Sequence, residues 1–351
     1  MGEAERAGAM EETMILTRIR PWVAALAVSA AVLAPAMAQQ PDFYRGKTME
    51  FIVGYPPGAG FDIYGRTLAQ FMGKHIPGNP TLVVKNMPGA SSLKGLQYIS
   101  AQAPKDGTSI GIFNPTLINL SVLEPKQVDV DFSKLTWLGN MSNDTKVCFA
   151  WGSSGIRSAD DIRAKQLIIG GTAQGAGLAY GSIMKAIFGD HVKLVLGYPS
   201  NSDVWLALER GEAEGNCTGW GVIPAMKPDW VANKKVNVLV QFAKKPSALL
   251  PNVPLVFDLG ISDDLKAAVS FLTLADSFTR PIIAPPGIPA DRAKLLRDAF
   301  HATMKDPEFL AQAAKGNLEI DPMDAETLVG LVQEIRNTPA SAVELAKKLS
   351  Q

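Results

Sequence analysis

Histidine and cysteine, on which most metal sites and many catalytic sites depend, are scarce in this sequence. The 351 residues contain only two cysteines and three histidines. The histidines, His75, His191 and His301, do not stand at ligand spacing from one another or from a cysteine. The sequence therefore predicts no metal site.

The glycine-rich segment "GYPPGAG" lacks the residues that nucleotide binding requires. A P-loop needs Gly-Lys-Ser or Gly-Lys-Thr after its glycines, and neither follows here. The dinucleotide pattern Gly-x-Gly-x-x-Gly, counted from Gly58 and Gly60, places Ile63 where the third glycine should stand. We therefore expect no cofactor.

An excess of charge of one sign is also absent. The chain has 34 Lys and Arg against 34 Asp and Glu, so its net charge is zero. No strong field then steers it onto nucleic acid or an anionic membrane surface. If the protein binds an anion, local groups must hold it.

The apolar run 22–33 follows two arginines and precedes "AMA", which ends at Ala38. It is shorter than the ~20 apolar residues of a membrane span. The order of charged, apolar and small residues is that of a secretory signal peptide. We expect residues 1–38 to be this peptide, cleaved near Ala38, with Met14 as an alternative start because the preceding residues are acidic.

The two cysteines, Cys148 and Cys217, allow three interpretations. In an exported protein one disulfide between them is expected, and two buried unlinked cysteines fit the sequence equally well. Cys217 also stands in "GNCTG", a cysteine form of the nucleophile elbow, which would make the protein a cysteine hydrolase. The charged run "LERGEAE" precedes it where an elbow needs a buried strand, which makes the hydrolase the weakest interpretation.

Strand-like and helix-like segments alternate after Asp42, which predicts an α/β fold with parallel strands. A second series of such segments begins at "KVCFAW". Two turns, "PPGAGFD" at 56–62 and "TAQGAG" at 172–177, each connect a strand to a helix. Unused N–H groups and the helix dipole at such a start bind anions. Asp62 is expected to cap its helix or, alternatively, to fix the shape of the loop or accept a hydrogen bond from a ligand amine or hydroxyl.

The segment 46–99 resembles the opening of the Bug-type receptors, the periplasmic solute-binding proteins of tripartite tricarboxylate transporters. Their pattern is an apolar strand, Pro-Gly-Gly-x-x-Asp, an arginine a few residues later, and a strand ending in Glu-Asn-x-Pro-Gly-Ala. Later blocks, such as "LPNVPLVFDLG" and "IIAPPGIPADRAKLLRDAF", follow in the family's order over essentially the whole mature chain. The matching residues of the first block are Pro57, Gly58, Ala59, Asp62, Arg66, Asn86, Pro88, Gly89 and Ala90.

The resemblance implies a two-lobed type II periplasmic binding protein of the α/β class. Each lobe would hold a mainly parallel sheet flanked by helices, and two segments would form the hinge. We expect one lobe from 42–144 plus 280–351 and the other from 145–279, because "KVCFAW" and "RPIIAPP" are placed to cross between them. A carboxylate ligand would be held between the lobes largely by backbone N–H groups and water, since the sequence shows no obvious arginine clamp.

The expected ligand-binding residues come from both glycine turns and from neighbouring segments. They are Pro57, Gly58, Ala59, Gly60, Phe61, Asp62, Asn114, Thr172, Ala173, Gln174, Gly175, Ala176, Gly177, Tyr198 and Thr218. The second lobe departs from the family pattern, with Tyr180 near a position where many members have histidine and Thr218 near an aspartate position. The resemblance therefore does not identify the acid.

The implied function is that of a periplasmic receptor, not an enzyme. It would capture a small organic carboxylate and deliver it to the permease subunits of a tripartite tricarboxylate-type transporter. We expect a monomer that binds no nucleic acid. A ligand sensor that presents its closed form to a membrane kinase is the alternative, because the ligand chemistry would be the same.

Overall fold

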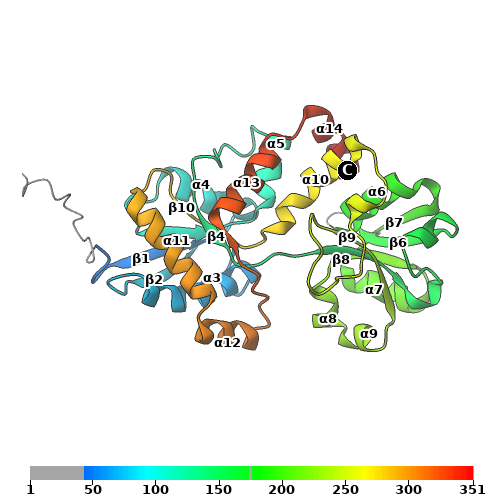
Figure 1. The fold of residues 1–351 in the computed structure, drawn as a ribbon, viewed down its shortest axis with the longest axis horizontal. Helices are drawn as coiled ribbons and strands as arrows, with labels where there is room; N and C mark the ends of the chain where they lie inside the picture. The colour runs from blue at the N-terminus through cyan, green and yellow to red at the C-terminus, as the bar shows by residue number, and fades with distance from the viewer. Residues whose placement is uncertain (1–42, 174–175, 351) are drawn as a thin grey trace, which may run out of the picture. The chain divides into compact units, whose positions relative to one another are not determined.

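The structure, a computed structural model, describes residues 43–173 and 176–350. The strands of this part of the chain form two separate sheets, and helices flank both of them (Figure 1). The expected signal peptide lies outside the described residues. Within them, no helix has the length and apolar character needed to cross a membrane.

The first sheet has six strands in the order β11-β4-β10-β3-β1-β2. Strand β1 pairs in parallel with β2 and β3, so their carboxyl ends meet at one edge of the sheet. Strand β10 runs antiparallel to both β3 and β4. The strands are β1 (Thr48–Val53), β2 (Thr81–Asn86), β3 (Ser109–Ile112), β4 (Thr136–Asn140), β10 (Pro281–Ala284) and β11 (Met323–Asp324).

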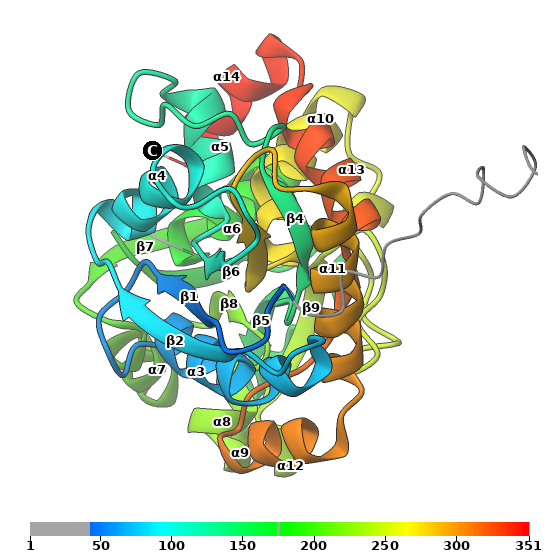
Figure 2. The same cartoon turned by 90° about the vertical axis from the view of Figure 1, so that its left-hand side faces the viewer.

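Successive side chains of β1 point to opposite faces of this sheet, and both faces are apolar. Phe51 and Val53 pack with Leu68 and Phe300, whereas Ile52 packs with Leu96 on the other side. Helices α3 and α11 contact each other over the first face, and α4, α5 and α13 belong to the second (Figure 2). The helices in this part of the sequence are α3 (Gly60–Met72), α4 (Leu93–Ala101), α5 (Thr116–Leu123), α11 (Ala290–Met304), α12 (Pro307–Lys315), α13 (Ala325–Arg336) and α14 (Ala340–Leu349).

The second sheet has five strands in the order β7-β6-β8-β5-β9. Strand β6 is parallel to β7 and β8, and β5 is antiparallel to β8 and β9. Its strands are β5 (Lys146–Trp151), β6 (Leu167–Thr172), β7 (Val192–Tyr198), β8 (Gly215–Gly219) and β9 (Val236–Phe242). The helices between these strands are α6 (Ala176–Phe188), α7 (Asn201–Arg210), α8 (Val222–Met226) and α9 (Pro228–Ala232).

The two-lobed fold agrees with the prediction, but both sheets are mixed rather than mainly parallel. The reason is that β10 and β5 come from segments next to the two crossings between the sheets and run against their neighbours. The strands of the second sheet all lie within 145–279. Helix α10 (Asp263–Thr273) also lies within this range, yet it packs on α13 and α14 of the C-terminal segment. The exact lobe boundaries therefore remain a prediction.

Cys148 on β5 and Cys217 on β8 face each other across the second sheet. They are directly paired in register, their Cα atoms are 4.1 Å apart, and a disulfide joins them. Both are fully buried. The segment "GNCTG" is thus a buried strand and not a nucleophile elbow, and in this form Cys217 has no thiolate with which to attack a substrate.

Candidate ligand-binding site

The first glycine turn, between β1 and α3, is closed by the carboxylate of Asp62. This side chain is buried, and its Oδ2 accepts hydrogen bonds from the N–H of Gly58, at 2.8 Å, and from Nε of Arg66, at 2.9 Å. Gly58 adopts φ +82°, a left-handed conformation that favours glycine. The turn therefore depends on Gly58 for its shape and on Asp62 for its closure.

The second oxygen of Asp62 ties the turn to the neighbouring strand. Its Oδ1 accepts from Nδ2 of Asn86, at 2.7 Å, and the same amide donates to the carbonyl of Tyr55, at 2.8 Å. Burial alone would raise the pKa of Asp62, but the hydrogen bonds from Arg66, Asn86 and Gly58 outweigh it and lower that pKa. Asp62 is thus engaged within the protein and fixes the shape of the loop, since the backbone N–H that it accepts from belongs to Gly58, before the helix.

The start of α3 leaves backbone donors unused. The N-cap residue Ala59 has φ −70° and ψ 158°, and its side chain accepts no hydrogen bond. The first bond into the helix runs from the N–H of Ile63 to the carbonyl of Ala59, at 3.0 Å. No acceptor in the described ranges meets the N–H groups of Gly60 and Phe61. These donors lie at the positive end of the helix dipole, where an anion is stabilised.

Arg280, directly before β10, borders this helix start. Its guanidinium carbon lies 4.4 Å from the ring centroid of Phe61 and 4.8 Å from that of Tyr64. A Cβ added to Gly60 would lie 3.7 Å from its Nη2. Nη1 donates to the carbonyl of Thr279 at 2.7 Å, and Nε is buried without a partner.

The charge of Arg280 has no partner within ion-pair distance among the described Asp and Glu side chains. Burial is the main cause of a lowered pKa for this guanidinium. An arginine remains protonated despite such a shift. The turn is therefore bordered by a partly desolvated positive charge.

Asn114, which follows β3, supports the aromatic side of the turn. Its Nδ2 donates to the hydroxyl of Tyr55 at 3.1 Å, and its N–H donates to Oγ of Ser92 at 2.8 Å. The ring of Tyr55 stacks on that of Phe61, with centroids 4.5 Å apart. The structure thus places Asn114 and Phe61 in one connected wall, while Pro57 and Gly58 are exposed.

The second glycine turn is described only in part, because Gln174 and Gly175 lie outside the described residues. Thr172 ends β6, Ala173 is exposed, and Ala176 begins α6. Gly177 is buried, and a Cβ there would lie 2.8 Å from the Cα of Gly171. This glycine allows α6 to pack closely on β6.

The remaining expected residues meet at the carboxyl edge of the second sheet. Tyr198 ends β7 and is the register partner of Thr172. Thr218, near the end of β8, is buried and accepts a hydrogen bond from Nδ2 of Asn201 at 3.3 Å. Thr172, Tyr198 and Thr218 therefore stand on three adjacent strands.

A buried polar cluster joins α6 to the segment before β10. The hydroxyl of Tyr180 donates to the carboxylate of Asp276, and Lys146 lies 3.7 Å from that carboxylate while also pairing with Asp144. Burial raises the pKa of Asp276 to about 6, although the charge of Lys146 opposes the shift. Sequence reasoning did not select Asp276.

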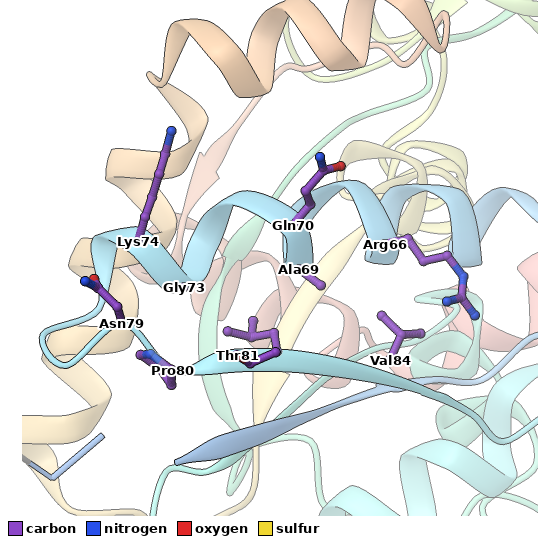
Figure 3. A pocket seen from close by; sticks show the side chains of 10 residues that line it. Arg66, Ala69, Gln70, Gly73, Lys74, Asn79, Pro80, Thr81 and Val84 are labelled. Carbon is purple, nitrogen blue, oxygen red and sulfur yellow. The ribbon is translucent and has the colours of Figure 1, made fainter. Parts of the chain in front are cut away.

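A separate hollow of about 620 Å³ lies along the flank of α3, beside strand β2. Figure 3 shows Arg66 at one end of this hollow and Lys74 at the other. Its lining includes none of the expected ligand-binding residues. The unused donors of Gly60 and Phe61 and the guanidinium of Arg280 are not in this hollow, and we place the candidate site with them.

Sequence reasoning also missed Arg280. The one available signal was its position in "DSFTRPIIAPP", where a single arginine stands immediately before an apolar strand in a segment expected to cross between the lobes. That signal does not reveal its contact with Phe61, because the two residues are far apart in the sequence.

Comparison with known proteins begins with the sequence. No family model matches the chain. The UPF0065 protein in the gbd 5′ region of Cupriavidus necator is 24% identical over 347 residues, which cover 93% of this chain and 97% of that protein.

Three solved structures of similar fold each match 87% of this chain. A TctC solute-binding protein from Polaromonas has a TM-score of 0.70 at 17% identity, with 99% of that protein covered. Rpa4515 of R. palustris, solved with adipate, has a TM-score of 0.54 at 17% identity, with 97% covered. MatC from Rhodopseudomonas palustris, solved with bound malate, has a TM-score of 0.51 at 15% identity, with 99% covered.

The family resemblance seen in the sequence implied a fold, and these solved structures have that fold. The chain has the fold of the TctC and Bug-type periplasmic binding proteins.

Proposed function

We propose that the protein is a periplasmic receptor that binds a small organic carboxylate between its two lobes. It delivers this ligand, as a monomer, to the permease subunits of a tripartite tricarboxylate-type transporter. The observation that carries the proposal is the start of α3, where the N–H groups of Gly60 and Phe61 are unused beside a positive charge. Two proteins of similar fold were solved with adipate and malate, which are both dicarboxylates.

The second lobe completes the site in this proposal. Its contribution is the carboxyl edge of the second sheet, where Thr172, Tyr198 and Thr218 stand on adjacent strands. A small acid that touches both this edge and the turn at Gly60 stabilises the arrangement in which the two are close. Ligand binding is therefore expected to favour a closed state.

The first test is a thermal-shift screen of refolded, ligand-free protein with mono-, di- and tricarboxylates, including malate and adipate. A ligand at ~100 Kd stabilises the native state by ~2.7 kcal/mol. We expect at least one di- or tricarboxylate to raise the Tm and to reduce the radius of gyration in small-angle scattering. If no acid in the panel raises the Tm, the proposed function is wrong.

The second test is Gly60→Val, which fills the space above the unused N–H groups. Gly60 is exposed and does not have a positive φ, and a Cβ meets only Arg280 within 4 Å, so the fold should tolerate the change. Binding of the acid found in the screen is expected to weaken by at least about 10-fold, the loss expected when charge-assisted hydrogen bonds are broken.

The matched control is Gly330→Val, an exposed helical glycine of α13 with nothing within 4 Å of an added Cβ. This variant should bind the acid like the wild type. Unchanged affinity in Gly60→Val would show that the first turn only connects β1 to α3.

A further inference from the structure

We propose that Arg280 pairs directly with a carboxylate of the ligand and makes the site selective for ionised acids over their neutral amides. This inference rests on the proposed function and adds the group that provides the charge. It replaces the expectation that backbone N–H groups and water hold the ligand without an arginine.

The guanidinium has one edge engaged and one edge unused. Nη1 donates to the carbonyl of Thr279, whereas Nε is buried without a partner and Nη2 lies next to Gly60. Nε and Nη2 form the side-on edge with which arginine binds a carboxylate through two parallel hydrogen bonds. A carboxylate at this edge would satisfy Nε and would also stand beside the unused N–H groups of α3.

The aromatic rings hold this group in place without neutralising it. Phe61 and Tyr64 both lie under the guanidinium, and cation–π contact favours a positive charge there. Asp144 acts on Arg280 only from beyond ion-pair distance, and its own carboxylate pairs with Lys146. A partly desolvated charge without a counter-ion is costly, and an anionic ligand would remove that cost.

The backbone of Arg280 is fixed by the other segment that crosses between the sheets. Its N–H donates to Oδ1 of the buried Asn140, at 2.9 Å, and its carbonyl accepts from the N–H of Met141, at 3.1 Å. Both crossing segments therefore hold the residue. With its backbone fixed in this way and its guanidinium held by Thr279 and the two rings, Arg280 is preorganised for its ligand.

Arg292 shows which features are not specific to a ligand site. Its guanidinium carbon lies 3.6 Å from the ring centroid of Phe43, its Nη1 donates to the carbonyl of Asp106 at 2.7 Å, and its Nε is also buried without a partner. What distinguishes Arg280 is the neighbouring helix start with its unused donors at Gly60. Arg292 is therefore the matched control.

The experiment measures binding of malate, adipate and citrate, and of malamide and adipamide, by titration calorimetry at neutral pH. The wild type is expected to bind at least one of the acids. If that acid is malate or adipate, the corresponding diamide should bind at least about 100-fold more weakly. Arg280→Gln is expected to weaken acid binding by about 10- to 100-fold and to abolish the preference over the amide. Arg280→Lys, which keeps the charge but loses the planar edge, should lie between them. Arg292→Gln should match the wild type.

The outcomes separate the two proposals. If no acid in the set binds the wild type, the proposed function fails, and the role of Arg280 fails with it. If the acid binds Arg280→Gln as tightly as the wild type, only the role of Arg280 is overturned. If Arg280→Gln lacks a cooperative thermal transition, the decision passes to Arg280→Lys, for which unchanged affinity and unchanged selectivity overturn the role.

Discussion

The two glycine-rich turns are alike in sequence, but different interactions fix them. In the first, the Asp62 carboxylate joins the turn to β2, and the space at Gly60 is bordered only by Arg280. In the second, Gly177 packs backbone to backbone against Gly171. A strand–glycine–helix pattern therefore does not by itself distinguish a glycine that leaves room for a ligand from one that leaves room for a strand. Four tests examine this difference.

The largest effect is expected from the disulfide, which strengthens the sheet of the second turn. Cys148→Ala combined with Cys217→Ala opens a covalent loop with a sequence separation of 69 residues. The loop-closure entropy predicts a loss of about 4 kcal/mol in the free energy of unfolding. Urea denaturation of the oxidised wild type and the double variant measures it. Equal midpoints and slopes would show that the bridge does not stabilise this sheet.

The next largest loss of stability is expected from a glycine substitution in the second turn, which is compared with the matched substitution in the first turn. Gly177→Ala places a Cβ 2.8 Å from the backbone of Gly171, and the helix or the strand must move. We expect a loss of about 1–3 kcal/mol, as in other overpacked cores. Gly60→Ala is the matched change in the first turn. The nearest atom there, Nη2 of Arg280, would lie at an ordinary contact distance of 3.7 Å, so the stability should stay close to that of the wild type. Similar losses in both variants would remove the contrast between the turns.

Asp62→Asn tests the polar closure of the first turn. The introduced amide group must face either the donors Gly58 and Arg66 or the donor amide of Asn86. We expect a loss of about 1–2 kcal/mol at neutral pH. Because the folded-state pKa of Asp62 is lowered, its contribution is present above the unfolded pKa of about 3.9 and is lost as the pH falls through the folded value. The difference between variant and wild type should therefore shrink in acid, and a difference that persists there would contradict this account.

The smallest effect concerns Asp276, which accepts a hydrogen bond from Tyr180 on the helix that follows the second turn. Its pKa is raised to about 6 in the folded protein, against about 3.9 in the unfolded chain. Between these values the folded state binds more protons, so stability rises as the pH falls from about 6 to about 4.

Asp276→Asn should remove this part of the pH dependence, because the amide does not titrate. Thermal unfolding of both proteins across this pH range measures the difference. Parallel curves would show that Asp276 titrates normally.

Much of the fold was predictable, because apolar periodicity follows local geometry. The segment "TLVVKN" at 81–86 has the apolar character of a strand and forms β2, and the helical apolar spacing of 62–76 overlaps α3. Ile63 has the helical spacing of that helix's apolar face but is 42% exposed, since it belongs to the first helical turn. "GNCTG" has no apolar run, and it is a strand only because β5 and β6 pair with it.

The candidate site was less predictable than the fold. The first turn could be located because its shape depends on residues close in the sequence, namely Gly58 and Asp62. Arg280 could not be located in this way, because its contact with Phe61 exists only after β10 has joined the first sheet. The same applies to the pairing of Tyr180 with Asp276, which depends on how α6 meets a distant segment.

The location of Arg280 has a kinetic consequence. Strand β10 belongs to the first sheet, and helix α3 belongs to the layer that covers it. The arginine and the N–H groups of Gly60 and Phe61 are therefore assembled before the second lobe takes part. Encounter with the acid is then separable from closure around it. The association rate constant should fall as ionic strength rises, because it depends on attraction between opposite charges. The subsequent rearrangement, a first-order step, should change little with salt in stopped-flow measurements.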